Sequence, residues 1–436
     1  MIEQNPLPFK LQFSDDLITP HAGLILAHEF HLKSGLGGLL RRMGPQPGSN
    51  RGYKADQVIL PLVLMLQGGG RRLSDLRALR NDPALRTAAG LGRLISADAV
   101  GDWLRRVGSD QAKLACLRRV QRQLVCKRLR ADSRSSFTLD VDASVIKSEK
   151  GDGAKAYDGT IGYQPMFGII AENGMLVHFE FRAGNVSPQS GGVEFISACE
   201  TTLPAGKRIG LVRSDSAFFN REVTDYCFRE GKRFIIAARW NSVVKGLYEL
   251  LGPDDWTRRK DPETRKLYEV ADMGYRFEGG LEAFRLIYKR ELKSQQELFE
   301  TGGGRIMVVA TNIPQEQTGA WEATQEYNAR GTMEQHIGEV KNGFGMCHMP
   351  CGQQEANAVW LWIGALAYNL FLMFREAALP ASWARAQVET LRWRLYQTAG
   401  KLVRHAGALI LKVACGREEF DVLWRIRGSP APLLTD

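Results

Sequence analysis

The sequence lacks the cysteine pattern of a disulfide framework. Its seven cysteines are an odd number, scattered along the chain at Cys116, Cys126, Cys199, Cys227, Cys347, Cys351 and Cys415. Small secreted domains that depend on disulfides carry an even number of cysteines at close spacing. The first residues also lack a basic region followed by an apolar run, so no secretory signal is expected. Both absences argue against the class of disulfide-rich secreted proteins and predict that the protein is located in a reducing cytoplasm.

Two cofactor patterns are also incomplete. Cys347, His348 and Cys351 have the ligand types of a zinc site, but no second ligand pair lies nearby at finger spacing. We therefore expect no structural zinc. The glycine tract Gly68–Gly70 lacks the Gly-Lys-Ser or Gly-Lys-Thr ending of a nucleotide loop, so ATP is not implied.

Charge is missing from one long segment. No charged residue stands between Ala356 and Phe374, and this length falls within the window for a membrane span. Asn357 and Asn369 interrupt the segment, however, and the sequence has no second segment of this kind. We therefore predict a buried core helix and no association with a membrane.

The length and composition indicate a globular protein with a net positive charge. The 436 residues exceed the usual size of a single core, so two or three domains are expected, and 44% apolar residues suffice to bury them. Lys and Arg number 58 against 48 Asp and Glu, a net charge of +10. Such a balance favours binding to a polyanion through counterion release, and a merely basic surface is the alternative.

The N-terminal part has the pattern of short helices rich in arginine, joined by Gly or Asp-Pro turns. Ser96 is placed to cap a helix on which Arg105 and Arg106 face outward, as on a recognition helix that contacts DNA. Many capped surface helices have the same pattern. The next segment, Lys113–Ala131, has apolar residues on one face and basic residues on the others. A solvated face and a phosphate-tracking face explain it equally well.

The middle part has the alternating pattern of strands. Three strand-like runs come first, at Ser135–Ser144, Tyr163–Ile170 and Met175–Phe181, with an Asn-Gly hairpin signal between the last two. A helix, a strand ending at Asp215, a helix and a strand ending at Arg239 follow. Three antiparallel strands followed by this alternation is the order of an RNase H-like fold, in which acids from the first and fourth strands converge.

We therefore predict an α/β protein with an RNase H-like catalytic core and a β-rich insertion, preceded by a helical DNA-binding domain and followed by a helical C-terminal region. A strand-like stretch, Ala408–Ala414, lies within the last region. The predicted boundaries are 1–132 for the DNA-binding domain, 133–239 and 312–379 for the two parts of the core, 240–311 for the insertion and 380–436 for the C-terminal region.

Three carboxylates are the candidate catalytic residues. Asp142 and Asp215 end predicted strands, and Glu334 lies on a predicted long helix that begins near Gly319 and is irregular around Gly331. Divalent cations such as Mg²⁺ prefer oxygen ligands, so acids gathered in this way indicate a two-metal site for phosphoryl transfer. Asp140 lies two residues before Asp142 and therefore on the same face of the strand, so either could bind metal.

The predicted helix also carries a specific spacing. Tyr327, Arg330, Glu334 and Lys341 are separated by two, three and six residues. This resembles the Y-(2)-R-(3)-E-(6)-K signature of bacterial insertion-sequence DDE transposases. The surrounding sequences LDVDAS, RSDSAFF, YNARGTMEQHIGEVKNGFG and ANAVWLWIGALAYNL look like the pattern of insertion-sequence family 1380.

The resemblance implies a role for each residue. Asp142 is preferred over Asp140 because the family's first acid precedes a small residue and then Ser or Thr. With Asp215 and Glu334 it would hold two Mg²⁺ ions, for which Mn²⁺ is a possible substitute. Tyr327, Arg330 and Lys341 would grip phosphates next to the cleaved bond, although helix-face ion pairs are the simpler interpretation of Arg330 and Lys341 alone.

The resemblance also implies the reaction and its partners. A cut-and-paste transposase binds double-stranded DNA at the terminal inverted repeats of its element, cleaves there and joins the 3′-ends to target DNA. A homodimer on paired ends, in the bacterial cytoplasm at the nucleoid, is the expected assembly. Two other functions stay open: a stand-alone RNase H-like nuclease, and an inactive DNA-binding regulator descended from a transposase.

Overall fold

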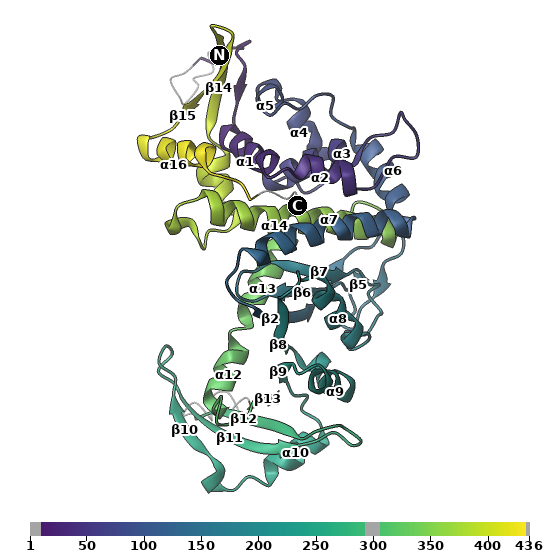
Figure 1. Ribbon diagram of the computed structural model, residues 1–436, viewed down its shortest axis with the longest axis vertical. Helices are drawn as coiled ribbons and strands as arrows, with labels where there is room; N and C mark the ends of the chain where they lie inside the picture. The colour runs from purple at the N-terminus through teal and green to yellow at the C-terminus, as the bar shows by residue number, and fades with distance from the viewer. Residues whose placement is uncertain (1–9, 293–305, 433–436) are drawn as a thin grey trace, which may run out of the picture.

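The computed structural model describes residues 10–292 and 306–432. Residues 1–9 of the predicted DNA-binding domain, 293–305 of the predicted insertion and 433–436 of the predicted C-terminal region lie outside the described residues. The molecule is elongated, with the N-terminal helices and the C-terminal segment at one end, a sheet in the middle and a β-rich part at the other end (Figure 1). The described part is therefore a mixed α/β protein.

Seven helices form most of the N-terminal part: α1 (Ala22–Lys33), α2 (Leu36–Met43), α3 (Ala55–Gln67), α4 (Leu76–Arg80), α5 (Pro83–Ala88), α6 (Ala97–Gly108) and α7 (Gln111–Arg130). The predicted cap of α6 is confirmed, because the Ser96 hydroxyl accepts a hydrogen bond from the Ala99 N–H at 3.2 Å. The inward face of α6 is buried through Val100, Trp103 and Leu104. This face packs against α14 (Gln354–Ala378).

One mixed sheet runs through the molecule in the order β10-β11-β12-β13-β9-β8-β2-β6-β7. Its strands are β2 (Ser136–Ala143), β6 (Met166–Ile170), β7 (Leu176–Glu180), β8 (Arg208–Ser214), β9 (Arg233–Ala237), β10 (Thr257–Lys260), β11 (Leu267–Tyr275), β12 (Phe284–Glu291) and β13 (Ile306–Thr311). β6 is antiparallel to β2 and β7, which confirms the predicted hairpin, whereas β8 is parallel to β2 and β9 is parallel to β8. The acids at the ends of β2 and β8 therefore lie at one edge of the sheet.

The segment predicted as an insertion continues this sheet. β13 pairs antiparallel with β9, and β12, β11 and β10 follow in order. Besides these strands, the segment contains helix α10 (Ser242–Glu249). Two further helices, α8 (Gly192–Thr202) and α9 (Arg221–Arg229), connect β7 to β8 and β8 to β9. The β-rich part is thus joined to the centre of the molecule by main-chain pairing.

The helix predicted from Gly319 is divided into successive pieces. These are α12 (Ala320–Asn328), α13 (Gly331–Gly338) and a π-helical turn (Glu339–Gly343). The predicted irregularity near Gly331 is confirmed, because α12 and α13 meet there. Tyr327 and Lys341 consequently lie on different pieces, so the sequence-based expectation of one helical segment is wrong at this break.

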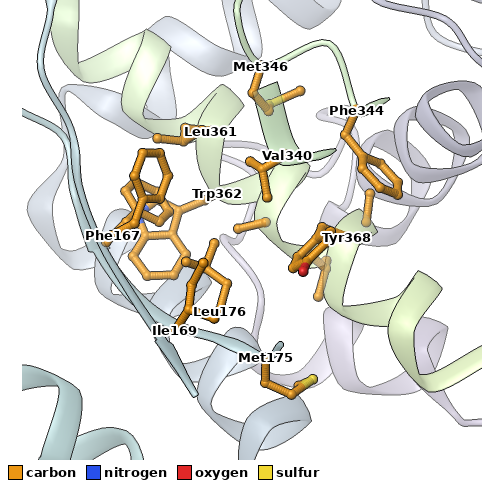
Figure 2. Close-up of a cluster of buried hydrophobic side chains, with 14 of the residues drawn as sticks. Phe167, Ile169, Met175, Leu176, Val340, Phe344, Met346, Leu361, Trp362 and Tyr368 are labelled. Atoms are coloured by element: carbon orange, nitrogen blue, oxygen red, sulfur yellow. The ribbon is translucent and has the colours of Figure 1, made fainter. Parts of the chain in front are cut away.

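A buried cluster fixes these pieces against the sheet. Figure 2 shows side chains from three sources packed together: the sheet and its hairpin, the π-helical turn with the residues after it, and α14. They include Phe167, Ile169, Leu176, Val340, Phe344, Met346, Leu361, Trp362 and Tyr368, all buried. The end of the helix that carries Glu334 is thereby packed between the sheet and α14.

Helix α14 is the apolar segment whose length fits a membrane span. In the described part of the chain it is the one helix long and apolar enough to cross a membrane, and 94% of its most apolar window is buried inside the protein. Its asparagines bind backbone groups. Asn369 accepts from the Leu176 N–H at 3.0 Å and donates to the Leu176 carbonyl at 2.8 Å. Asn357 makes the same pair of bonds with Cys351. The prediction of a core helix is confirmed.

The prediction of a helical C-terminal region is wrong in part. Helices α15 (Val388–Leu391) and α16 (Arg417–Gly428) flank an antiparallel hairpin of β14 (Ala399–His405) and β15 (Ala408–Ala414). The strand predicted at 408–414 is confirmed as β15. Its partner β14 contains Ala, Lys, Leu and Arg, which are good helix formers, so the sequence of β14 does not indicate a strand. Pairing with β15 on one side and with β1 (Ile18–Thr19) on the other decides its conformation. The N-terminal strand β1 is thus part of the sheet formed by the C-terminal hairpin.

Candidate active site

The sheet brings Asp142 and Asp215 together. β2 and β8 are parallel neighbours, with Val141 opposite Ser214. The residues that follow this pair, Asp142 just before the end of β2 at Ala143 and Asp215 just after β8, therefore lie side by side. The Asp215 carboxylate also accepts a hydrogen bond from the Ala217 N–H at 3.0 Å, which begins a short 3₁₀ turn. This turn holds Asp215 at the end of its strand.

Glu334 completes the group of acids. It is exposed on α13, whose buried side is anchored by Met333 and Ile337. Burial raises the pKa of Asp142 to about 6; the nearby Arg330 opposes this rise, while the charges of Asp215 and Glu334 add to it. The three carboxylates predicted from the sequence therefore interact electrostatically.

Asp140 occupies a different environment. Its carboxylate is 1% exposed and is bound by the Arg213 guanidinium, with Nε–Oδ1 at 2.7 Å and Nη2–Oδ2 at 2.9 Å. Burial raises the pKa of Asp140, and the Arg213 hydrogen bonds and charge oppose that rise. Since both of its oxygens are engaged, Asp142 is the acid of this strand that remains available.

Arg213 also reaches the helix that carries the signature residues. Its Nη1 donates to the Glu326 carbonyl at 2.8 Å and to the Glu326 carboxylate at 2.9 Å. Glu326 directly precedes Tyr327, so Arg213 fixes the end of α12 against β2 and β8. Arg213 precedes Asp215 by two residues, but its buried carboxylate partner is Asp140 on the neighbouring strand β2.

Arg330 forms an ion pair with Asp142. Its Nη2 is 3.0 Å from Asp142 Oδ1 and 3.4 Å from the Val141 carbonyl oxygen. The Nε of Arg330 is buried without a hydrogen-bond partner among the described residues. Tyr327 is half-buried nearby; burial raises its pKa, Arg330 opposes this, and the charges of Asp215, Asp142 and Glu334 add to it. Both signature residues therefore lie among the acids.

Lys341 is held on the loop after β2. Its Nζ donates to Ser144 Oγ at 3.0 Å and to the Val145 carbonyl at 2.8 Å. Burial lowers the pKa of Lys341, and the charge of Asp142 opposes this change. Despite the break between the helices, all four signature residues thus lie next to the ends of β2 and β8.

The site suits a divalent cation by the chemistry of its ligands. Three carboxylates supply oxygen atoms. Burial raises the pKa of Asp142, and the charges of Asp215 and Glu334 raise it further, a repulsion that a bound cation would relieve. Within residues 10–292 and 306–432, however, no three His, Cys, Asp or Glu side chains are close enough to hold one ion. The Arg330 guanidinium occupies one oxygen of Asp142. Metal binding therefore requires these side chains to move together.

Arg105 and Arg106 are not part of this group. Both are exposed near the end of α6, and Arg105 forms an ion pair with Asp102 at 2.6 Å, one turn earlier in the same helix. They remain candidates for a separate contact with DNA.

The comparisons with known proteins identify the family. The family model described as Transposase DDE domain group 1 matches residues 5–427. Among solved structures, the chain is similar to the piggyBac transposase in its synaptic complex with hairpin DNA, with 11% sequence identity, a TM-score of 0.48, and coverage of 86% of this chain and 79% of that chain. The comparison with curated proteins finds no match. Because the family model spans nearly the whole sequence, the chain belongs to the group 1 family of DDE-domain transposases.

Proposed function

We propose that this protein is a cut-and-paste DNA transposase of the insertion-sequence family 1380 type, built on an RNase H-like core. It would bind the terminal inverted repeats of its element in double-stranded DNA, cleave them and join the 3′-ends to target DNA. The strand order β7-β6-β2-β8-β9 supports this core, because β7, β6 and β2 pair antiparallel while β2, β8 and β9 pair parallel. Assembly as a homodimer on paired ends, and a location at the bacterial nucleoid, belong to the same proposal.

One observation carries the proposal. Asp142 lies beside Asp215 at adjacent strand ends, with Glu334 close enough to raise the Asp142 pKa further. Like charges gathered at one edge repel one another and lower the stability of the fold, so this arrangement favours a catalytic purpose. Asp142, Asp215 and Glu334 would hold the ions.

Two bound divalent ions, Mg²⁺ or its substitute Mn²⁺, would supply activation of water or of a 3′-hydroxyl and stabilisation of the leaving 3′-oxygen. The protein's own residues do the positioning. Arg330 holds the Asp142 carboxylate, and its guanidinium can bind a phosphate when the acids take up cations. Lys341 keeps the loop after β2 in place beside the acids.

The test is cleavage by a variant that keeps the shape of one acid. We expect purified protein to cut a duplex carrying the element's ends when Mg²⁺ or Mn²⁺ is added. Glu334→Gln should bind the same duplex without cutting it, because a neutral amide is a much weaker ligand for a hard cation. Glu322→Gln, at an exposed position on α12, is the matched control and should cut normally. Full cleavage by Glu334→Gln would remove Glu334 from the mechanism.

The fate of the cut ends separates the alternatives. A transposase joins the 3′-ends to a target duplex, which a gel resolves as a longer product. A stand-alone nuclease of the same fold would leave free ends. An inactive regulator would bind the ends and cut nothing under any metal condition. The presence of all three acids favours the two enzymes over the regulator.

A further inference from the structure

A groove with a volume of about 910 Å³ lies between three segments that are far apart in the sequence. These are the turn Arg71–Ser74 before α4, the loop Lys147–Lys150 and the loop Cys347–Pro350. The middle segment starts at β3 (Ile146–Lys147), which belongs to a small sheet with β5 (Ile161–Tyr163) and β4 (Ala154–Lys155). We call this feature the basic groove.

The walls of the basic groove are positively charged. Arg71, Arg72, Lys147 and Lys150 line it and are exposed, and Glu149 is the single acid among its lining residues. Glu149 pairs with Lys147 at 3.0 Å, and Arg71 pairs with Glu389 at 3.4 Å. Within the described ranges, Arg72 and Lys150 have no acidic partner. Two cations therefore face the groove uncompensated.

The arginine wall is rigid. Asp75 accepts hydrogen bonds from the backbone N–H groups of Arg71 and Arg72, at 2.8 and 2.9 Å. Gly345, at φ +70°, lies directly against Arg71, so a Cβ at this glycine would come within 2.9 Å of the Arg71 backbone. This close approach requires glycine and fixes the turn to the loop that follows the π-helical turn.

The lysine wall is fastened in the same way. Gly151, at φ +50°, packs so tightly that a Cβ would lie 2.0 Å from the Gly352 carbonyl oxygen. Asp152 donates its backbone N–H to that same oxygen at 2.9 Å, and its side chain accepts from the Gln354 N–H at 3.0 Å. The groove is therefore formed before any ligand arrives, and binding costs little ordering of these loops.

The groove begins where the candidate active site ends. The Val145 carbonyl that accepts from Lys341 directly precedes β3, which leads into the lysine wall. The Lys341 carbonyl accepts from the Cys347 N–H at 3.0 Å, at the start of the third wall. Lys341 thus joins the loop after Asp142 to two walls of the groove.

We propose that the basic groove binds the phosphodiester backbone of duplex DNA beside the bond that is cleaved. The inference rests on the proposed function, since it takes DNA as the ligand of the neighbouring acids. Cations carried on anchored loops along a groove match a chain of phosphates, and each contact releases counterions. The groove would supply affinity and position, while the acids supply the chemistry.

Salt dependence of binding tests the groove. We compare Arg72→Ala/Lys150→Ala with Arg208→Ala/Arg233→Ala, which removes the same charge from the exposed starts of β8 and β9, at the opposite ends of these strands from Asp215. With a labelled duplex of arbitrary sequence, the groove variant should lower the slope of log K against log salt by up to about 1.8, or about 0.9 per lost phosphate contact. The control should keep the wild-type slope.

A charge-conserving variant guards against misfolding. Arg72→Lys/Lys150→Arg should retain the wild-type slope, and circular dichroism should give the same spectrum for all variants. An unchanged slope in the folded Arg72→Ala/Lys150→Ala protein would overturn the groove while leaving cleavage by the acids intact. If the wild type neither binds nor cuts duplex DNA, the proposed function fails together with the groove.

Alkylation of cysteine provides a second readout without substitutions. Cys347 is half-buried in the groove wall, whereas Cys415 is exposed at the end of β15. Added duplex should slow the reaction of Cys347 with iodoacetamide more than that of Cys415, as measured by peptide mass spectrometry. Equal protection of the two cysteines would contradict a groove that is covered by DNA.

Discussion

Strand β2 carries two aspartate–arginine pairs of the same chemistry in opposite surroundings. Asp140 and Arg213 are 1% and 4% exposed, and two short hydrogen bonds join them. Asp142 and Arg330 are 20% and 9% exposed and share one contact at 3.0 Å. The first pair is closed, and the second pair opens onto two further acids.

The difference separates structure from function. In the closed pair the guanidinium satisfies both carboxylate oxygens and also binds Glu326, so it fastens α12 to the sheet. In the open pair one cation, Arg330, faces three carboxylates; burial raises the Asp142 pKa to about 6, and the charges of Asp215 and Glu334 add to this rise. An excess of negative charge in a partly exposed place can attract cations, while a neutralised buried pair cannot.

The largest expected effect is on cleavage. Asp142→Asn should lower the rate of DNA cleavage by at least about 10²–10³-fold, the cost of removing one electrostatic contact to a transition state. Binding of the duplex should persist, because the groove and Lys341 are untouched. Gel-based cleavage under single-turnover conditions measures the rate. The assignment reverses if Asp142→Asn cuts normally while a folded Asp140→Asn variant is inactive.

The next effect is on stability and concerns the closed pair. Arg213→Ala leaves the buried Asp140 charge without a partner and should cost about 3–5 kcal/mol of unfolding free energy. Arg330→Ala should cost clearly less, because the Asp142 carboxylate reaches solvent. Urea unfolding measures both. The double variant Arg213→Met/Asp140→Leu should recover much of the loss, since it removes both charges. Equal losses from the two arginine variants would erase the distinction between the pairs.

The sequence could predict the pieces of this site but not the choice between the pairs. Alternation and an Asn-Gly turn mark β2, β6 and β7, and the signature spacing marks Glu334. Alternation also places Asp140 and Asp142 on one face, so local pattern treats them alike. What distinguishes them is Arg213 from the neighbouring strand and Arg330 from a distant helix, contacts that only the tertiary fold creates.

The basic groove was hidden for the same reason. Its walls come from a turn before α4, a loop after β2 and a loop before α14. The first two segments alone look like ordinary polar loops, and the third is notable only for the ligand types of a zinc site. The tight glycine contacts at Gly345 and Gly151 bring them together, and glycine in a loop has many possible causes in a sequence.

The smallest expected effect is a dependence of the unfolding free energy on pH, which comes from Asp142 in the open pair. The pKa of Asp142 is raised in the folded protein from 3.8 to about 6, so folding disfavours its charged form. Its contribution to stability is full below pH about 4 and is lost as the pH rises through 6. Relative to Asp142→Asn, which does not titrate, the wild type should lose on the order of 2–3 kcal/mol between pH 4 and pH 7.5.

The slope of this difference is the decisive quantity. Replacing the carboxylate also weakens the contact with Arg330, but that cost is an offset that does not change with pH. Titrating groups that do not interact with Asp142 cancel in the difference, because both proteins contain them. Urea unfolding across this pH range gives the slope, and a flat difference would show that folding does not raise the pKa of Asp142. Saturating Mg²⁺ should stabilise the wild type at high pH, because a bound cation favours the charged carboxylates. Asp142→Asn lacks one of these carboxylates and should gain less, so the difference between the two proteins should depend less on pH.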